Sequence, residues 1–134
     1  MKKIILICLV TLSSAFAYTQ KDRIADMQTM AAAMHDIQSG FFYNNFDMVK
    51  IGGATLADTI IKVEPPLSEV EEKDVMTRFM NNKVKMTNNT KKRIKKKAKI
   101  MIERFRDGDP DQALRNFTAI EKECMKCHVQ LRKW

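Results

Sequence analysis

The spacing of glycine and proline is the strongest constraint on the fold of this 134-residue chain. Neither residue occurs between Tyr18 and Ser39, nor anywhere between Pro66 and Gly108. Such long uninterrupted runs favour helices, because glycine and proline disrupt helix interiors more than other residues do. No segment of useful length alternates apolar and polar residues as a strand would, and no internal repeat is visible. The sequence therefore predicts an all-α chain of about one domain.

Apolar residues that recur at steps of three and four predict four helices. Their expected ranges are Thr19–Ser39, Asn44–Val63, a third from Asn81 or Asn82 to Arg106, and a fourth from Asp109 to the C-terminus. Gly40 is expected to end the first helix. Asp109 suits the cap of the fourth helix, and Pro110 suits its first position. The middle of the third helix, residues 87–92, contains no apolar residue to bury. Four helices joined by short turns are expected to pack as an antiparallel bundle.

Each predicted helix has one face of residues that can point inward. These positions are Ile24, Met27, Met30, Ala31, Met34, Ile37 and Gln38 in the first; Phe46, Val49, Leu56 and Ile60 in the second; Val84, Ile94, Ala98, Met101, Ile102 and Phe105 in the third; and Ala113, Phe117, Ile120 and Leu131 in the fourth. Gly52 and Gly53 are expected either to weaken the second helix or to let another backbone come close.

Residues 1–17 have the pattern of an export signal that is removed from the mature protein. Lys2 and Lys3 are basic, residues 4–12 are apolar, and Ala15-Phe16-Ala17 forms a small-x-small cleavage pattern. The apolar run has roughly half of the ~20 residues that a membrane-spanning helix needs, although an uncleaved anchor is the alternative. Cys8 lies inside this run, too early for lipid attachment, and would be discarded. The mature domain is predicted to be 18–134, located in the periplasm.

The segment Cys124-Met125-Lys126-Cys127-His128 has the C-x-x-C-H pattern of c-type haem attachment. Two thiols at this spacing can form thioether bonds with the two vinyl groups of one haem, and the adjacent imidazole can bind the iron. At ~100° per residue, Cys124, Cys127 and His128 lie on one face of a helix. The sequence therefore predicts one covalent haem c on the C-terminal helix, with His128 as the proximal iron ligand.

Two other readings of the cysteine pair are less well supported by the sequence. A thiol-redox C-x-x-C motif usually lies where a strand meets a helix, and no strand is predicted here. A structural zinc ion needs four ligands, and the only other histidine is His35. His35 as a second haem ligand is a further alternative, but helical geometry places it toward the edge of the apolar face.

The position of this motif in a final helix resembles the class II cytochromes c, which comprise cytochrome c prime and its low-spin relatives of the c-556 type. The similarity covers 18–134 and is strongest in two places: Gly108-Asp109 through Phe117 to Cys124-x-x-Cys127-His128-x-x-Leu131-Arg132, and Arg23-Ile24-Ala25-Asp26-Met27. The family often has an aromatic residue in place of Leu131. The resemblance implies that Arg23 lies near a haem propionate and that Met27 is the distal residue.

The identity of the distal residue separates electron carriers from gas-binding members of that family. Methionine there implies a low-spin haem with histidine and methionine ligands, whereas an apolar residue implies five-coordinate iron that binds nitric oxide or carbon monoxide. From the residues alone, Met27, Met30 and Met34 share one side of the first helix, where methionine is also an ordinary core residue. Met27 is the preferred ligand and Met30 the reserve.

The predicted function is therefore single-electron transfer between redox partners, not enzymatic catalysis. Removing the two lysines of the leader from 24 basic residues leaves 22 against 16 acidic ones, a formal charge of +6. Seven of the nine residues in 91–99 are basic, either as a solvated helix face or as a docking patch for an acidic partner. Nucleic acid is not an expected partner, because no aromatic residues alternate with these lysines. The family resemblance allows a homodimer through the first two helices, and a small peroxidase-like activity is the weakest alternative.

Overall fold

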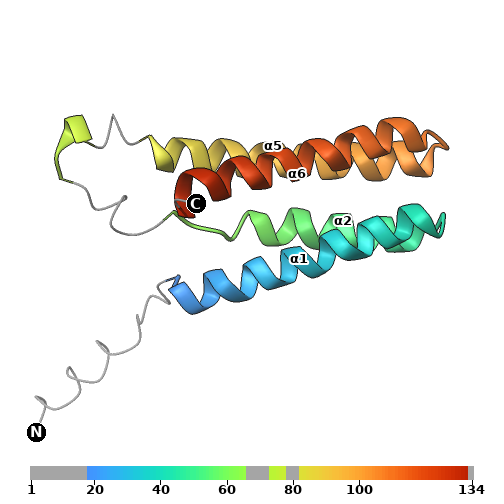
Figure 1. Cartoon of the computed structure of the whole chain (residues 1–134), viewed down its shortest axis with the longest axis horizontal. Helices are drawn as coiled ribbons and strands as arrows, with labels where there is room; N and C mark the ends of the chain where they lie inside the picture. Colours follow the sequence, from blue (N-terminus) through green and yellow to red (C-terminus); the bar gives the residue numbers. More distant parts are fainter. Residues whose placement is uncertain (1–17, 66–72, 78–81, 133–134) are drawn as a thin grey trace, which may run out of the picture.

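The computed structural model describes residues 18–65, 73–77 and 82–132. Four long helices make up most of this part: α1 (Gln20–Phe42), α2 (Phe46–Ile60), α5 (Lys83–Arg106) and α6 (Pro110–Arg132) (Figure 1). A helical turn occupies 75–77, and the described residues contain no strand. The all-helical prediction is confirmed. The predicted export signal, residues 1–17, lies outside the described residues. Within them, no helix combines the length and apolarity needed to cross a membrane.

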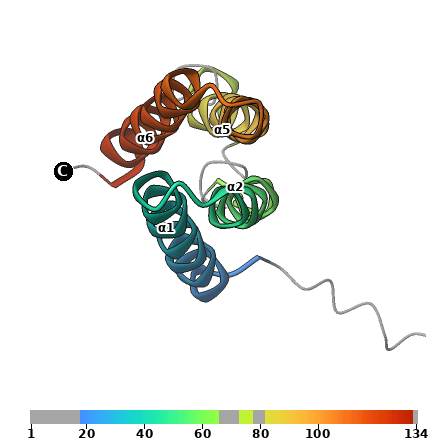
Figure 2. The same ribbon diagram turned by 90° about the vertical axis from the view of Figure 1, so that its right-hand side faces the viewer.

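The four long helices lie around a common centre when they are viewed end-on (Figure 2). α1 packs against α2, α2 against α5, and α5 against α6. All four contribute to one core, which consists of Met30, Ala33, Ile37, Val49, Leu56, Ile60, Val63, Ile94, Ala98, Met101, Ala113, Phe117 and Ile120. This arrangement is consistent with a helical bundle.

The start of α6 agrees with the predicted cap at Asp109 and the predicted first residue, Pro110. Gly108 has a φ of 78°, which favours glycine, and Pro110 is the first helical residue. The carboxylate of Asp109 accepts a hydrogen bond from the amide of Gln112 at 3.1 Å. This is the N-cap interaction that satisfies a backbone donor left free at a helix start.

Gly40 does not end the first helix, which continues to Phe42. A Cβ atom at Gly40 would lie 2.8 Å from Cγ2 of Val49 and 2.9 Å from its backbone nitrogen. The glycine is therefore needed for close packing of α1 against α2. The predicted helix end at Gly40 was wrong, because the glycine is required by packing against Val49 and not by a turn in the chain.

α5 is continuous through the stretch that carries no apolar residue. Its inward positions there are Thr87 and Thr90, which are 2% and 3% exposed. Threonine can fill a core position through its methyl group. The predicted helix is confirmed, and these two buried residues were not predicted.

The predicted inward face of α1 needs a correction. The buried residues are Met30, Ala33, Ile37 and Gly40. By contrast, Ile24, Ala31 and Gln38 are exposed, and Met27 and Met34 are partly buried. Met30 and Ile37 are buried as predicted, whereas the line through Ile24, Ala31 and Gln38 lies to one side of the core.

Gly52 is closely surrounded by α1, which makes it a sensitive position. A Cβ atom there would lie 2.8 Å from the carbonyl oxygen of Ala33 and 2.9 Å from Cγ1 of Ile37. At Gly53 the corresponding clashes involve only side-chain atoms of Ile102 and Met101, which can move. Of the two expectations for Gly52 and Gly53, close approach of another backbone is confirmed at Gly52, and the helix is not interrupted.

We expect Gly52→Ala to lower the free energy of unfolding by about 1–3 kcal/mol, the usual cost of overpacking. Gly53→Ala serves as the matched control and should be closer to neutral, because its clashes can relax and alanine favours the helix. Denaturant midpoints of the two variants test this. Equal midpoints would contradict the proposed contact with the Ala33 backbone.

Candidate cofactor site

The three residues of the C-x-x-C-H motif lie on one side of α6. Cys124, Cys127 and His128 are all partly buried, whereas Met125 between them is 53% exposed. Cys124 packs against the core, one turn after the fully buried Ile120. Helical periodicity explains this arrangement, because residues three and four apart share a face.

A groove of about 480 Å³ lies between this side of α6 and the first half of α1. Its lining from α6 is Cys124 and His128. From α1 it is lined by Ile24, Met27, Gln28, Met30, Ala31 and Met34. Several apolar residues at the edge of the α1 core face, Met27 and Met34 among them, therefore face the motif.

A second, smaller hollow of about 240 Å³ lies beside the other cysteine. Met27 and His128 line both hollows, whereas Met30 lines only the groove. The second hollow is otherwise lined by Gln20, Arg23, Ile24, Val63, Glu64, Cys127 and Leu131. The predicted site residues Arg23, Met27, Cys127 and His128 are thus brought together from opposite ends of the sequence.

The position of these hollows follows from the packing of the helices. α1 packs closely on α2 but makes no comparable backbone contact with α6 in the described part of the chain. Because the backbones of α1 and α6 are farther apart, the space between these two helices is filled only by side chains and is incompletely filled at the two hollows. This side of the bundle is where a flat group could lie between α1 and α6.

The thiols of Cys124 and Cys127 both have raised pKa values. Burial raises the pKa of the Cys124 thiol to about 11, and the nearby Cys127 thiol adds to the effect. Burial also raises the pKa of Cys127. The two cysteines form no disulfide. A reactive redox cysteine has a lowered pKa instead, so the thiol-redox reading loses support.

Arg23 carries an unpaired polar group beside the motif. Its Nε is buried and has no hydrogen-bond partner among the described residues. Its guanidinium lies 5.7 Å from the centre of the Tyr18 ring, and Tyr18 donates a hydrogen bond to Asp26 at 2.8 Å. Burying a guanidinium nitrogen without a partner is costly, so an anionic group in this hollow would be stabilised there.

These features fit a haem. The motif supplies two thiols and an imidazole, α1 supplies thioethers opposite them, and Arg23 supplies a donor suited to a carboxylate. The described residues contain no cluster of three or more His, Cys, Asp or Glu side chains arranged to bind a metal ion by themselves.

Other predicted residues lie elsewhere, and some neighbours of the site were not predicted. The side chain of His35 is 78% exposed, with Nδ1 4.0 Å from the carboxylate of Asp36, so it lines neither hollow. Val63 and Glu64, which follow α2, line the second hollow. Their place in the site depends on tertiary packing, and no local sequence signal marks it.

Comparisons with known proteins give no match: no protein-family model, no curated protein and no solved structure resembles the chain detectably.

Proposed function

We propose that this chain is a periplasmic monohaem c-type cytochrome of class II that carries single electrons between redox partners. In this proposal the helices form an antiparallel four-helix bundle. The observation that supports it most is the convergence of Met27 from α1 with Cys127 and His128 from α6 around one hollow. Residues 1–17 would direct export, and the mature domain would begin at Tyr18.

Each residue of the site has a distinct role in this proposal. Cys124 and Cys127 would hold the haem through thioether bonds, and His128 would bind its iron. Met27 would supply a thioether as the other iron ligand, because it lines both hollows together with His128. The buried Nε of Arg23 donates to a propionate. Met30 is a weaker candidate for ligation, because it is 8% exposed and belongs to the core.

A His–Met pair of ligands suits electron transfer rather than catalysis. Such a haem supplies one-electron redox chemistry and has no open coordination position, and methionine ligation raises its reduction potential. Ile24, Met34 and Leu131 contribute apolar or weakly polar walls to the hollows. Burial by such walls also influences the potential.

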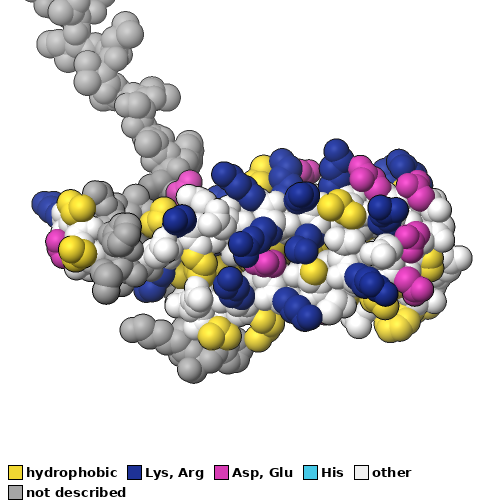
Figure 3. Space-filling model, turned by 90° about the horizontal axis from the view of Figure 1, so that it is seen from above, with side chains coloured by type: hydrophobic (Ala, Val, Ile, Leu, Met, Phe, Trp, Pro, Cys, Tyr) yellow, Lys and Arg dark blue, Asp and Glu magenta, His cyan; other side chains and the backbone are white. Residues whose placement is uncertain are grey.

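The basic residues of α5 suit an acidic redox partner. Ile94 and Ala98 are buried, whereas Lys92, Lys95, Lys96 and Lys99 are exposed. Figure 3 shows many Lys and Arg side chains over the face formed by α5 and α6, with fewer Asp and Glu side chains among them. Charges of one sign on a surface increase the association rate with an oppositely charged partner, and salt weakens the effect.

The direct test is to export the full chain in a host that attaches haem c. Mass spectrometry should then show the mature chain, cleaved before Tyr18, with the added mass of one haem. The ferric protein should have a low-spin spectrum with the weak long-wavelength band of sulfur ligation. A chain recovered without covalent haem would contradict the proposal. A covalent but high-spin haem whose ferrous form binds carbon monoxide at once would favour the gas-binding alternative.

A further inference from the structure

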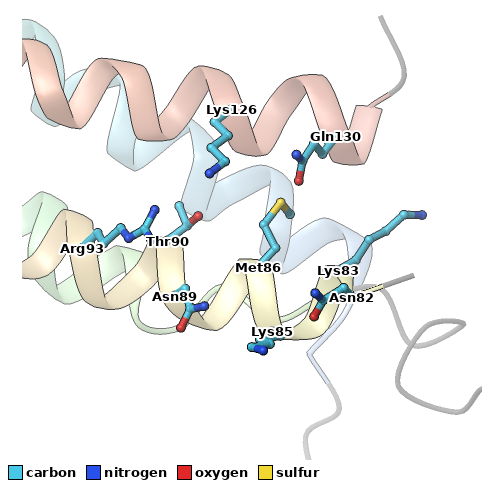
Figure 4. Close-up of a pocket in the computed structure, with 9 residues that line it drawn as sticks. All are labelled: Asn82, Lys83, Lys85, Met86, Asn89, Thr90, Arg93, Lys126 and Gln130. Atoms are coloured by element: carbon cyan, nitrogen blue, oxygen red, sulfur yellow. The ribbon is translucent and has the colours of Figure 1, made fainter. Parts of the chain in front are cut away.

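A hollow of about 550 Å³ lies between the first half of α5 and the end of α6 (Figure 4). It shares no lining residue with the two hollows at the haem motif. In Figure 4, Lys126 and Gln130 reach from α6 toward α5, where Met86, Thr90 and Arg93 face them. The remaining lining residues are Asn82, Lys83, Lys85 and Asn89.

The polar lining of this hollow consists of hydrogen-bond donors. Four side chains are cationic (Lys83, Lys85, Arg93 and Lys126), and lysine and arginine donate without accepting. Three carboxamides and the Thr90 hydroxyl add donors that can rotate to suit a ligand. No described carboxylate lines the hollow. Such a lining selects a ligand that is anionic and accepts hydrogen bonds.

A salt bridge holds Arg93 in place at the edge of the hollow. Its Nη1 lies 3.4 Å from Oε1 of Glu123, whose side chain is only 15% exposed. This contact joins α5 to α6 and orients the guanidinium. A preordered arginine loses less conformational entropy when it binds a ligand.

The N-terminus of α5 adds to the positive potential here. Asn82 precedes the helix with a φ of 39° and makes no side-chain cap, and the first turn contains no acidic residue. The positive end of the helix dipole therefore lies at the end of the hollow that Asn82 and Lys83 line.

We propose that this hollow binds a phosphate group. Phosphate carries a charge of about −1.5 to −2 near neutral pH and three strong acceptor oxygens, which suits the donors that Lys126 and Gln130 of α6 and Thr90 and Arg93 of α5 direct toward one another. A single carboxylate of a partner protein would use only part of this donor set.

The test is titration of the purified protein with inorganic phosphate, against sodium chloride at equal ionic strength, followed by amide chemical shifts in NMR spectra. Shifts should saturate with phosphate and concentrate on residues 82–93 and 126–130. Lys126→Gln should weaken the affinity about tenfold, the expected loss for one charge-assisted contact. Lys85→Gln, from the other helix, should act in the same direction.

Lys96→Gln is the matched control, because Lys96 is exposed on α5 and does not line the hollow. It should change the affinity less than twofold. An equal loss in Lys96→Gln and Lys126→Gln would overturn the proposal, because binding would then reflect overall charge. Chloride that reproduces the phosphate shifts would overturn it as well.

Two further probes distinguish a lipid phosphate from a carboxylate of a partner protein. Vesicles containing phosphatidic acid test a lipid headgroup, with phosphatidylcholine vesicles as the control. Lys126-dependent binding to the acidic vesicles, displaced by free phosphate, would support the site and assign it to lipid. A polyglutamate peptide that binds through Lys126 while phosphate does not would overturn the proposal in favour of a protein-docking surface.

Discussion

The double substitution Cys124→Ser with Cys127→Ser should abolish covalent haem attachment completely. A serine hydroxyl does not form the thioether bond that joins the porphyrin to the chain. Both positions are partly buried on the side of α6 that lines the hollows, so the substitution changes the chemistry with little change in volume. Haem staining of denatured protein and mass spectrometry of the exported chain would measure the loss.

Met125→Ser is the matched control for this experiment. Met125 lies within the same motif but is 53% exposed, so attachment should persist. The two single variants should each retain one thioether bond and give reduced amounts of attached haem. Covalent haem in the double variant would contradict the assignment of the site, as would its loss in Met125→Ser.

Met27→Ala should convert the haem from low-spin to high-spin. If Met27 is an iron ligand as proposed, removing its thioether would leave the iron without a second strong ligand, so the long-wavelength sulfur band should disappear and the ferrous protein should bind carbon monoxide. The structural basis is that Met27 lines both hollows with His128 and is only partly buried. Absorption spectra of both oxidation states, with and without carbon monoxide, provide the measurement.

Met30→Ala distinguishes ligation from packing. Met30 is 8% exposed in the core, so its truncation should cost about 2–5 kcal/mol of stability while the sulfur band remains. The opposite pattern, with the band lost in Met30→Ala and kept in Met27→Ala, would assign the ligand to Met30. Neither outcome depends on the phosphate site, because the two sites share no residue.

The sequence predicted best those features that depend on neighbouring residues. The start of α6 needed only Gly108, Asp109 and Pro110, and the structure agrees. Gly40 was misread because its role depends on Val49, a residue of the next helix. The Arg93–Glu123 contact joins residues 30 positions apart, so no local pattern could indicate it.

The apolar face of α1 shows a different limit. Periodicity identified a broad apolar side, but it could not separate the core line from the line that faces α6. Met30 is buried in the core and also lines the groove, whereas Met27 packs on the edge of the core and lines both hollows, although the two residues are one turn apart. The distinction depends on which helix packs against each line, and only the tertiary structure provides it.

The loose pairing of α1 with α6 has a consequence for how such a protein would be assembled. Three of the four neighbouring helix pairs are closely packed, and α1 with α6 is not. This open side is also the side that carries the cysteines. If the chain is the exported cytochrome proposed above, a haem could enter from this side without separating closely packed helices.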